Sequence, residues 1–211
     1  MTHMDDCREA YDRVADEYVR RIFGELEHKP FDRAWLDRFA AEVAGVGPVC
    51  DLGCGPGHVA RYLSERGVKV VGFDLSPAMV ERARLLTPEV DFEVGDFTAL
   101  DPQRTWSGLV AFYSLIHVAR EFLPETLRGL YRALLPGAPL TVAFHIGDSV
   151  LHLDEWWGTP VSVDFHFFTT DAMIAVLRDC GFDVVEAVER DPYPDIEHPS
   201  RRAYIDARRP Q

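Results

Sequence analysis

A short glycine-rich run could bring the backbone close to a ligand. It follows the apolar segment 48–52, which is typical of a short buried strand, and it leads into an expected helix. The spacing departs from the dinucleotide-binding fingerprint, because His58 stands where the last glycine is required. An acid directly before the loop would oppose a pyrophosphate but help to hold a cationic amino group. We therefore expect a cofactor other than NAD or FAD on the residues Asp51, Gly53, Cys54, Gly55 and Gly57.

Two carboxylates follow at the ends of the next two expected strands. Asp74 comes 21 residues after Gly53, where a carboxylate can accept hydrogen bonds from both hydroxyls of a ribose. Asp96 could accept a hydrogen bond from an adenine amino group, and Phe97 offers an apolar contact for the ring. Either acid alone could be a helix cap or a turn former. Together with the loop, they predict a nucleoside-sized trough over Gly55, with Asp74 pointing into it.

Alternating periodicities predict the elements that position these residues. We expect helices at 5–26, 31–43, 58–66, 77–86, 124–135 and 171–180. Ser76 is expected to cap the helix at 77–86, and Thr170 the helix at 171–180. We expect strands at 48–52, 68–74, 90–94, within 106–113, and at 139–145, 182–189 and 203–208. Strands alternating with helices indicate a parallel sheet covered on both faces. The last two strands are predicted to pair as an antiparallel hairpin, and 146–168 fits neither period and is interpreted as an insertion over the end of the sheet.

Several segments resemble the motifs of the class I S-adenosylmethionine (SAM)-dependent methyltransferase family, in its small-molecule branch. The resemblance spans roughly Tyr11 to Arg208, and Ala138 stands where glycine is usual. It implies a Rossmann-like, doubly wound, seven-stranded and mostly parallel α/β sheet whose last strand is antiparallel. It also implies SAM as the cofactor, in a single domain over 1–211. The matching segments are Val49–Gly57, Val70–Met79, Phe92–Thr98, Leu109–His117 and Leu134–Leu140.

The resemblance also implies further SAM contacts. The N-terminal helices, within 1–46, would form a lid over the cofactor, and Tyr11 and Tyr18 lie seven residues apart on one helical face. An ordinary amphipathic helix with half-buried tyrosines would give the same pattern. Lys29 could meet the SAM carboxylate, although we favour a solvated lysine. The other expected cofactor contacts are Leu75, Met79, Thr98, Tyr113 and Ser114.

Methyl transfer from a sulfonium needs alignment of the partners, and a base only where the acceptor must lose a proton. His117 follows the fourth strand and is the best base candidate, because imidazole titrates near neutral pH; packing against the cofactor is an equal alternative. His145 follows the fifth strand and is the second catalytic candidate. The insertion favours an aromatic acceptor pocket over a metal site, since no pair has metal-ligand spacing. We expect the acceptor to contact His117, His145, His152, Trp156, Trp157 and His166.

The totals limit the classes of partner. A net charge of -13 repels nucleic acid and anionic lipid, and no apolar run approaches the length of a membrane helix. The sequence favours a small organic acceptor, methylated at O, N or C, and a cytoplasmic protein whose four cysteines are reduced. The sequence leaves open whether the protein forms a homodimer. The alternatives are a cyclase-like enzyme on the same fold, a SAM-binding regulatory module and, more distantly, an oxidoreductase.

Overall fold

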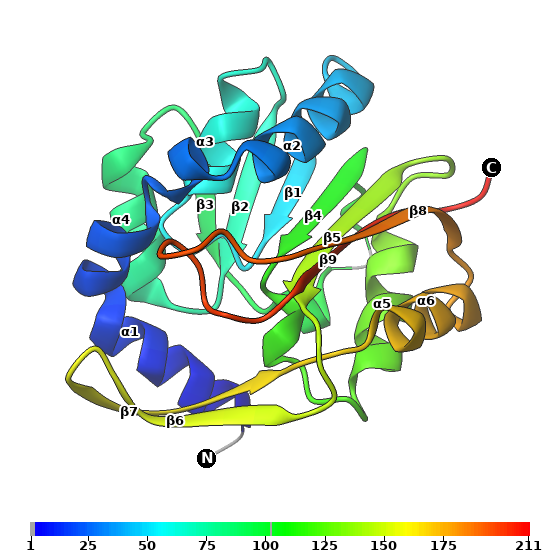
Figure 1. The fold of residues 1–211 in the computed structure, drawn as a ribbon. Helices are drawn as coiled ribbons and strands as arrows, with labels where there is room; N and C mark the ends of the chain where they lie inside the picture. The colour runs from blue at the N-terminus through cyan, green and yellow to red at the C-terminus, as the bar shows by residue number, and fades with distance from the viewer. Residues whose placement is uncertain (1–2, 102) are drawn as a thin grey trace.

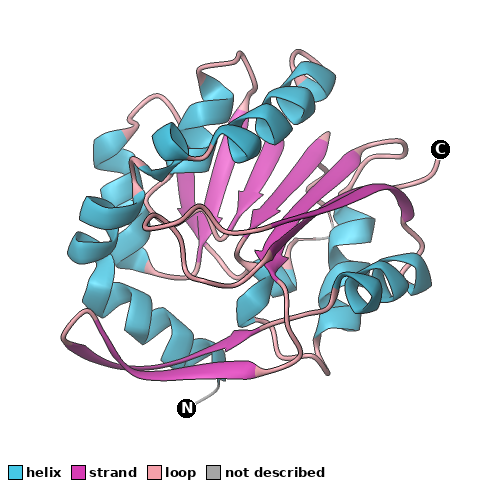
Figure 2. Cartoon of the chain, in the orientation of Figure 1, coloured by secondary structure: helices cyan, strands magenta, loops and turns pink. Residues whose placement is uncertain are grey.

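The computed structural model describes residues 3–101 and 103–211 and contains a seven-stranded sheet between two layers of helices (Figures 1 and 2). The strand order is β3-β2-β1-β4-β5-β9-β8. Strands β1 to β5 are parallel, and β9 is antiparallel to both neighbours. The predicted fold class and C-terminal hairpin are therefore confirmed. The strands are β1 (Val49–Leu52), β2 (Val70–Asp74), β3 (Asp91–Val94), β4 (Gly108–Phe112), β5 (Pro139–His145), β8 (Asp183–Arg190) and β9 (Arg202–Arg208).

Each face of the sheet has its own apolar core. On one face, α2 (Pro30–Val43), α3 (His58–Ser64) and α4 (Pro77–Leu86) bury a cluster that includes Leu36, Leu63 and Val80. On the other, α5 (Leu123–Ala133) and α6 (Thr170–Asp179) bury a cluster that includes Leu127 and Leu177. Burial on both faces explains why the central strands are continuously apolar in sequence.

The carboxyl ends of the parallel strands meet at one edge of the sheet. The chain moves outward from β1 to β2 and β3, and then crosses to β4 and β5 on the other side. Ligands of open α/β sheets bind in the crevice at such a reversal. Helix α1 (His3–Ile22) and the hairpin of β6 (Val150–Trp156) and β7 (Thr159–His166) lie across this edge (Figure 1).

The predicted insertion at 146–168 is an antiparallel hairpin rather than an irregular segment. Trp156 pairs with Thr159, so the turn has only two residues, Trp157 and Gly158, and both have positive φ, 53° and 81°. Two positive φ angles are what a type I′ hairpin turn requires. Trp-Gly is an unusual pair for this turn, which is why the sequence did not reveal the hairpin. The apolar face of β7 packs on α1 through Val163 and Cys7.

The element boundaries differ from the predictions in a few places. The first helix ends at Ile22 instead of continuing to 26, because Gly24 interrupts it before the 3-10 turn η1 (Glu25–His28). Helix α6 is capped by Thr169, whose hydroxyl accepts a hydrogen bond from the Ala172 backbone N–H at 3.2 Å, and not by Thr170. Ser76 caps α4 as expected.

Two general features concern the whole described chain. All four cysteines are buried and free of disulfides. Among the helices of residues 3–101 and 103–211, none combines the length and apolar character needed to cross a bilayer.

Candidate functional site

The glycine loop after β1 has the backbone that its sequence predicts. Gly53, Gly55 and Gly57 all have positive φ, between 52° and 85°. A side chain at Gly53 would lie 2.6 Å from Cβ of Ser114. Above Gly55 the nearest atom belongs to the Tyr18 ring of α1, at 3.7 Å from the position of a Cβ. A ligand could therefore approach the backbone of Gly55 from the side on which α1 now lies.

Asp74 ties the loop to the next strand. Its two carboxylate oxygens accept hydrogen bonds from the backbone N–H groups of Gly55 and Ser76, each at 2.8 Å. Burial raises the pKa of this carboxyl to about 6, although both hydrogen bonds oppose the shift. Each oxygen keeps a second lone pair, and Asp74 lines the cavity over the loop.

Three buried polar atoms beside the loop have no hydrogen-bond partner among the described residues. They are Oδ2 of Asp51, Nδ1 of His58 and Oγ of Ser114. Asp51 is only 2% exposed, and burial raises its pKa to about 7. Leaving such groups unsatisfied is costly, so they are suited to a ligand with its own donors.

The cavity over the loop is smaller than the nucleoside-sized trough that we expected. It measures about 80 Å³, because side chains from α1 fill the space between the loop and the helix. Among the predicted cofactor residues, Asp51, Cys54, Gly57, Met79, Asp96 and Thr98 do not line it. Asp96 instead accepts hydrogen bonds from the backbone and hydroxyl of Thr98 and caps a 3-10 turn, η2 (Phe97–Ala99). Those that do line it are Tyr11, Tyr18, Gly53, Gly55, Asp74, Leu75, Phe97, Tyr113 and Ser114.

His117 stands at the wall of this small cavity within a hydrogen-bonded chain. It belongs to the 3-10 turn η3 (Leu115–His117) after β4. Its Nδ1 lies 3.1 Å from the carbonyl oxygen of Asp164, which can only accept, so Nδ1 carries the hydrogen. Its Nε2 lies 2.7 Å from the Tyr11 hydroxyl. In the neutral form of this imidazole, Nε2 accepts the Tyr11 hydrogen. Burial raises the pKa of Tyr11 well above its usual value, so this phenol stays protonated.

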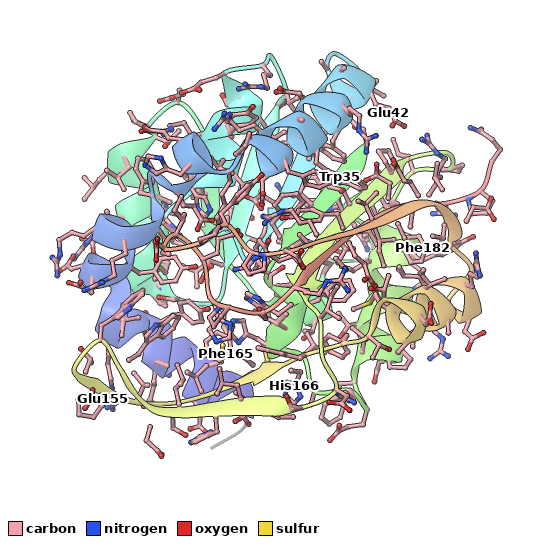
Figure 3. The ribbon with its side chains drawn as sticks, in the orientation of Figure 1. Trp35, Glu42, Glu155, Phe165, His166 and Phe182 are labelled. Carbon is pink, nitrogen blue, oxygen red and sulfur yellow. The ribbon has the colours of Figure 1, made fainter. Side chains whose placement is uncertain are left out.

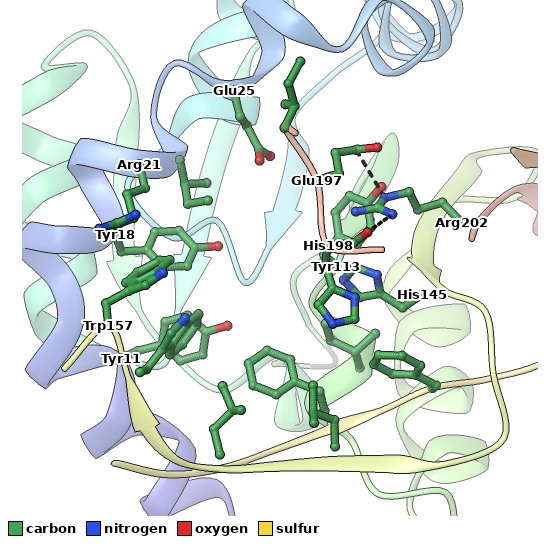
Figure 4. A pocket seen from close by; sticks show the side chains of 18 of the residues that line it. Tyr11, Tyr18, Arg21, Glu25, Tyr113, His145, Trp157, Glu197, His198 and Arg202 are labelled. Carbon is green, nitrogen blue, oxygen red and sulfur yellow. Dashed lines mark hydrogen bonds and ion pairs between the residues drawn. The ribbon is translucent and has the colours of Figure 1, made fainter. Parts of the chain in front are cut away.

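A larger cavity of about 560 Å³ adjoins the small one (Figure 4). On one side lie Tyr11, Tyr18 and Arg21 of α1 with Trp157 of the hairpin turn, and on the other lie residues from β5 and the β8–β9 loop. The two cavities share the lining residues Tyr11, Tyr18, Glu25 and Tyr113. Tyr113 has a positive φ of 56°, an uncommon conformation that clusters at functional sites.

Strand alternation decides which predicted acceptor residues line the larger cavity. Leu151 and Leu153 of β6 and Phe165 of β7 face it, and Figure 3 shows Phe165 on the side of the hairpin toward the sheet. His152 and His166 do not line this cavity, because neighbouring residues of a strand point to opposite faces. His152 is exposed and pairs with Asp164 at 2.6 Å, and His166 is buried away from the cavity. His117 lines only the smaller cavity, whereas His145, Trp156 and Trp157 line the larger one.

His145 is not suited to act as a base. Its Nδ1 lies 2.8 Å from the Ser200 hydroxyl, and its ring stacks on Phe167 at 5.3 Å. Burial and the nearby Arg202 guanidinium lower its pKa to about 3, so the imidazole is neutral and weakly basic. Among residues 3–101 and 103–211, no three His, Cys, Asp or Glu side chains gather as a metal would need.

Sequence reasoning missed a buried cluster of charged residues at the larger cavity. Lys29 is 5% exposed and not solvated as we favoured; its ammonium lies 2.7 Å from Glu25 and 3.4 Å from Glu197. Glu197 also pairs with Arg190 and Arg202 at 2.7 and 3.2 Å. The four-residue spacing of Glu25 and Lys29 was the available signal. Glu197 comes from an irregular loop and gave none.

Comparison with known proteins agrees with this architecture. A family model described as a methyltransferase domain matches residues 49–137. The malonyl-[acyl-carrier protein] O-methyltransferase of Enterobacter lignolyticus is 29% identical over 70% of this chain and 57% of its own length. The trans-aconitate 2-methyltransferase of Methylobacterium radiotolerans is 34% identical over 63% of this chain and 46% of its own. The chain thus spans about half the length of these relatives.

The fold is shared with a solved structure over almost all of both chains. The magnesium protoporphyrin IX methyltransferase of Synechocystis PCC 6803, solved with S-adenosylhomocysteine (SAH), has a TM-score of 0.76 at 18% identity. The match covers 99% of this chain and 100% of that one. The glycine loop, the acid after β2 and the sheet order agree with these matches, which together support a class I SAM-dependent methyltransferase domain that includes residues 49–137.

Proposed function

We propose that the protein transfers the methyl group of SAM to a small organic acceptor bound in the larger cavity. One observation carries the proposal: Tyr11, Tyr18, Glu25 and Tyr113 line both cavities. A methyl donor held over the glycine loop would therefore meet an acceptor held among the aromatic side chains. The aromatic walls would exclude water and align the two reactants, which is the main requirement of an in-line displacement.

The residues around the loop fit SAM, which supplies a methyl group activated by a sulfonium. Asp51 has a buried carboxylate oxygen without a partner and would hold the ammonium of the amino-acid tail. Asp74 would use its remaining lone pairs for the ribose hydroxyls, while its bonds to Gly55 and Ser76 fix its orientation. Aromatic faces of Tyr11 and Tyr18 suit a neighbouring cation.

Helix α1 must move aside before the cofactor can bind. Small-molecule sites usually have volumes of about 300–1,000 Å³, and the cavity over the loop has about 80 Å³. The covering side chains come from α1, including Cys7, Tyr11 and Tyr18. The helix would act as a lid that opens for SAM and closes over it.

An acceptor that must lose a proton would lose it to Tyr11 and His117 together. Tyr11 lines the larger cavity and His117 does not, so the acceptor's proton would pass to the Tyr11 oxygen. The Tyr11 hydrogen would pass at the same time to Nε2 of His117, along their 2.7 Å hydrogen bond. The Asp164 carbonyl would stabilise the resulting imidazolium through Nδ1–H.

Calorimetric titration with SAM tests the cofactor assignment. Replacing Asp74 with alanine removes a hydrogen bond from a charged group, which contributes about 1.5–3 kcal/mol, so SAM affinity should fall roughly 10- to 100-fold. The matched control is Asp96→Ala, since Asp96 accepts hydrogen bonds from the backbone and hydroxyl of Thr98 and caps η2, and it should affect SAM affinity little. Equal affinity of wild type and Asp74→Ala would refute the assignment.

Turnover with a panel of phenols, amines and carboxylates tests the reaction itself. Methylation forms SAH and adds one CH₂ to the mass of the acceptor. A product of unchanged mass would point to a cyclase-like reaction. Binding of NAD in place of SAM would point to an oxidoreductase.

A further inference from the structure

One side of the larger cavity has no part in holding the cofactor. It is built by His145 at the end of β5, His198 in the β8–β9 loop and Arg202 at the start of β9 (Figure 4). All three line the larger cavity, and none lines the cavity over the glycine loop. We refer to these three residues, with Ser200 between the two histidines, as the Arg202 subsite.

Arg202 offers hydrogen-bond donors that the protein does not use. Its side chain is only 3% exposed. Nη1 donates to the backbone carbonyl of His198 at 2.7 Å and to that of Ser200, and Nε lies 3.2 Å from Glu197. Within residues 3–101 and 103–211, Nη2 donates to no other group. Nε is buried and makes no hydrogen bond in spite of its closeness to Glu197, whereas Nη2 is not enclosed by protein and can donate to an oxygen of a molecule in the cavity.

The two histidines add an acceptor to these donors. Nδ1 of His145 and Nδ1 of His198 lie 2.8 and 3.2 Å from the same Ser200 oxygen. A hydroxyl has one hydrogen, so at least one imidazole must donate its own Nδ1–H to Ser200. That ring has its lone pair at Nε2. Burial and Arg202 lower the pKa of both histidines, so both rings are neutral.

The surrounding charges favour an anion at this place. Glu197 is paired with Lys29, Arg190 and Arg202, and Glu25 and Asp32 balance Lys29 and Arg190. Each of the three carboxylates Glu25, Asp32 and Glu197 is thus paired with a cation. At His145, Arg202 and Lys29 lower the pKa and Glu197 raises it, so the two cations prevail over the carboxylate at this ring. The cluster as a whole is balanced, in a protein with a net charge of -13.

We propose that the Arg202 subsite binds a carboxylate of the methyl acceptor, and that the acceptor is a planar aromatic acid. Nη2 of Arg202 donates to one carboxylate oxygen, and the imidazoles orient a second polar group beside it. The ring of the acid lies among Tyr113, Trp156 and Phe165, which line the same cavity. The proposal deepens the proposed function, because it names the class of acceptor for that same site.

The test compares two probes that differ only in charge, 2-naphthoate and 2-naphthamide. Both are titrated into the full chain saturated with SAH, with calorimetry and tryptophan fluorescence as readouts, since Trp156 and Trp157 line the cavity. A charge-assisted hydrogen bond should make naphthoate bind at least about tenfold more tightly than the amide. Arg202→Gln should abolish the difference between the probes. Arg21→Gln is the control, because Arg21 lines the opposite side of the cavity and pairs with Glu17 (Figure 4).

Equal binding of the two probes to wild type, tighter binding of the amide, or binding of neither would overturn the proposal, whether or not Arg202→Gln folds. A loss of SAH affinity in Arg202→Gln, with the preference for naphthoate retained, would also overturn it by moving Arg202 to the cofactor site. The titration of wild type with SAM decides the proposed function separately. The probes are also titrated without SAH, and a chain that prefers naphthoate in this second titration but fails to bind SAM would keep the subsite and lose the methyltransferase.

Discussion

If Tyr11 and His117 transfer a proton, replacing either residue should affect kcat differently for acceptors that lose a proton and for those that do not. Phenols and amines must lose a proton, and a general base contributes about 10²- to 10⁴-fold in rate. We expect Tyr11→Phe and His117→Ala both to lower kcat by this order with such acceptors. An acceptor carboxylate is already ionised at neutral pH, so both variants should lower kcat for its methylation much less.

Steady-state assays of SAH release with one acceptor of each kind make this comparison. Tyr11→Phe keeps the ring that covers the loop, and its SAM affinity should stay near that of wild type. His152→Phe serves as the control, because His152 lines neither cavity. Undiminished turnover of a phenol by His117→Ala would exclude the proton transfer.

The raised pKa of Asp51 leads us to expect that SAM affinity depends on pH. Burial raises its pKa from 3.8 to about 7, so the free protein is about half protonated here at pH 7. The SAM ammonium pairs with the ionised form, and affinity should therefore rise about tenfold from pH 5.5 to 7. Asp51→Asn should bind SAM more weakly and should flatten this part of the pH profile, with Asp74 accounting for what remains near pH 6.

The raised pKa of Asp51 should affect stability in the opposite direction: SAM affinity rises with pH, whereas the stability of the unliganded protein falls. Because the folded-state pKa of Asp51 is above the unfolded one, its contribution is lost as pH rises through about 7. The unliganded Asp51→Asn variant should consequently have a higher Tm than wild type at pH 8, and this difference should shrink between pH 7 and pH 4, where the unfolded carboxyl also becomes protonated. A Tm difference that does not change with pH would show that Asp51 is not protonated in the folded protein.

At the scale of elements, α1 is fastened to the N-terminus of α4. Asp12 accepts hydrogen bonds from the Ser76 hydroxyl and, at 3.1 Å, from the backbone N–H of Ala78. These bonds satisfy N–H and O–H groups at a helix start, where a carboxylate is also favoured by the helix dipole. Asp16 pairs with Arg82 at 2.8 Å, but its side chain is 69% exposed and the pair should contribute little.

Releasing this contact should speed the opening of the lid. We expect Asp12→Ala to raise both the association and the dissociation rates of SAH several-fold in stopped-flow measurements, with faster amide exchange over α1. Asp16→Ala is the matched control and should leave the rates near those of wild type. If Asp12→Ala leaves all three quantities unchanged, α1 does not limit access.

Across the whole molecule, the sequence was most informative where local chemistry and periodicity agree. The switch from helical to strand periods predicted the sheet, its two layers of helices and the antiparallel C-terminal hairpin. The glycine spacing predicted the positive φ angles of Gly53, Gly55 and Gly57. Asp74 at the end of β2 was predicted beside the loop, and it bonds directly to Gly55.

The residues that line the larger cavity could not be predicted in the same way, because they are brought together by contacts between distant segments. Lys29, Glu197 and Arg202 meet at one cavity although they come from the first and last fifths of the chain. Their burial follows from mutual pairing, which no local pattern encodes. His152 and His166 looked equivalent to Trp156 in sequence, and the face of the hairpin that packs on α1 separated them.

The sequence by itself determined the fold and the cofactor loop, because both depend on backbone conformation and on apolar spacing over a few residues. The tertiary structure alone decided the closed position of α1, the Tyr11–His117 hydrogen bond and the Arg202 subsite. Each of these depends on how the hairpin, α1 and the β8–β9 loop pack over the edge of the sheet. Side chains far apart in the chain acquire their protonation states and partners only through that packing.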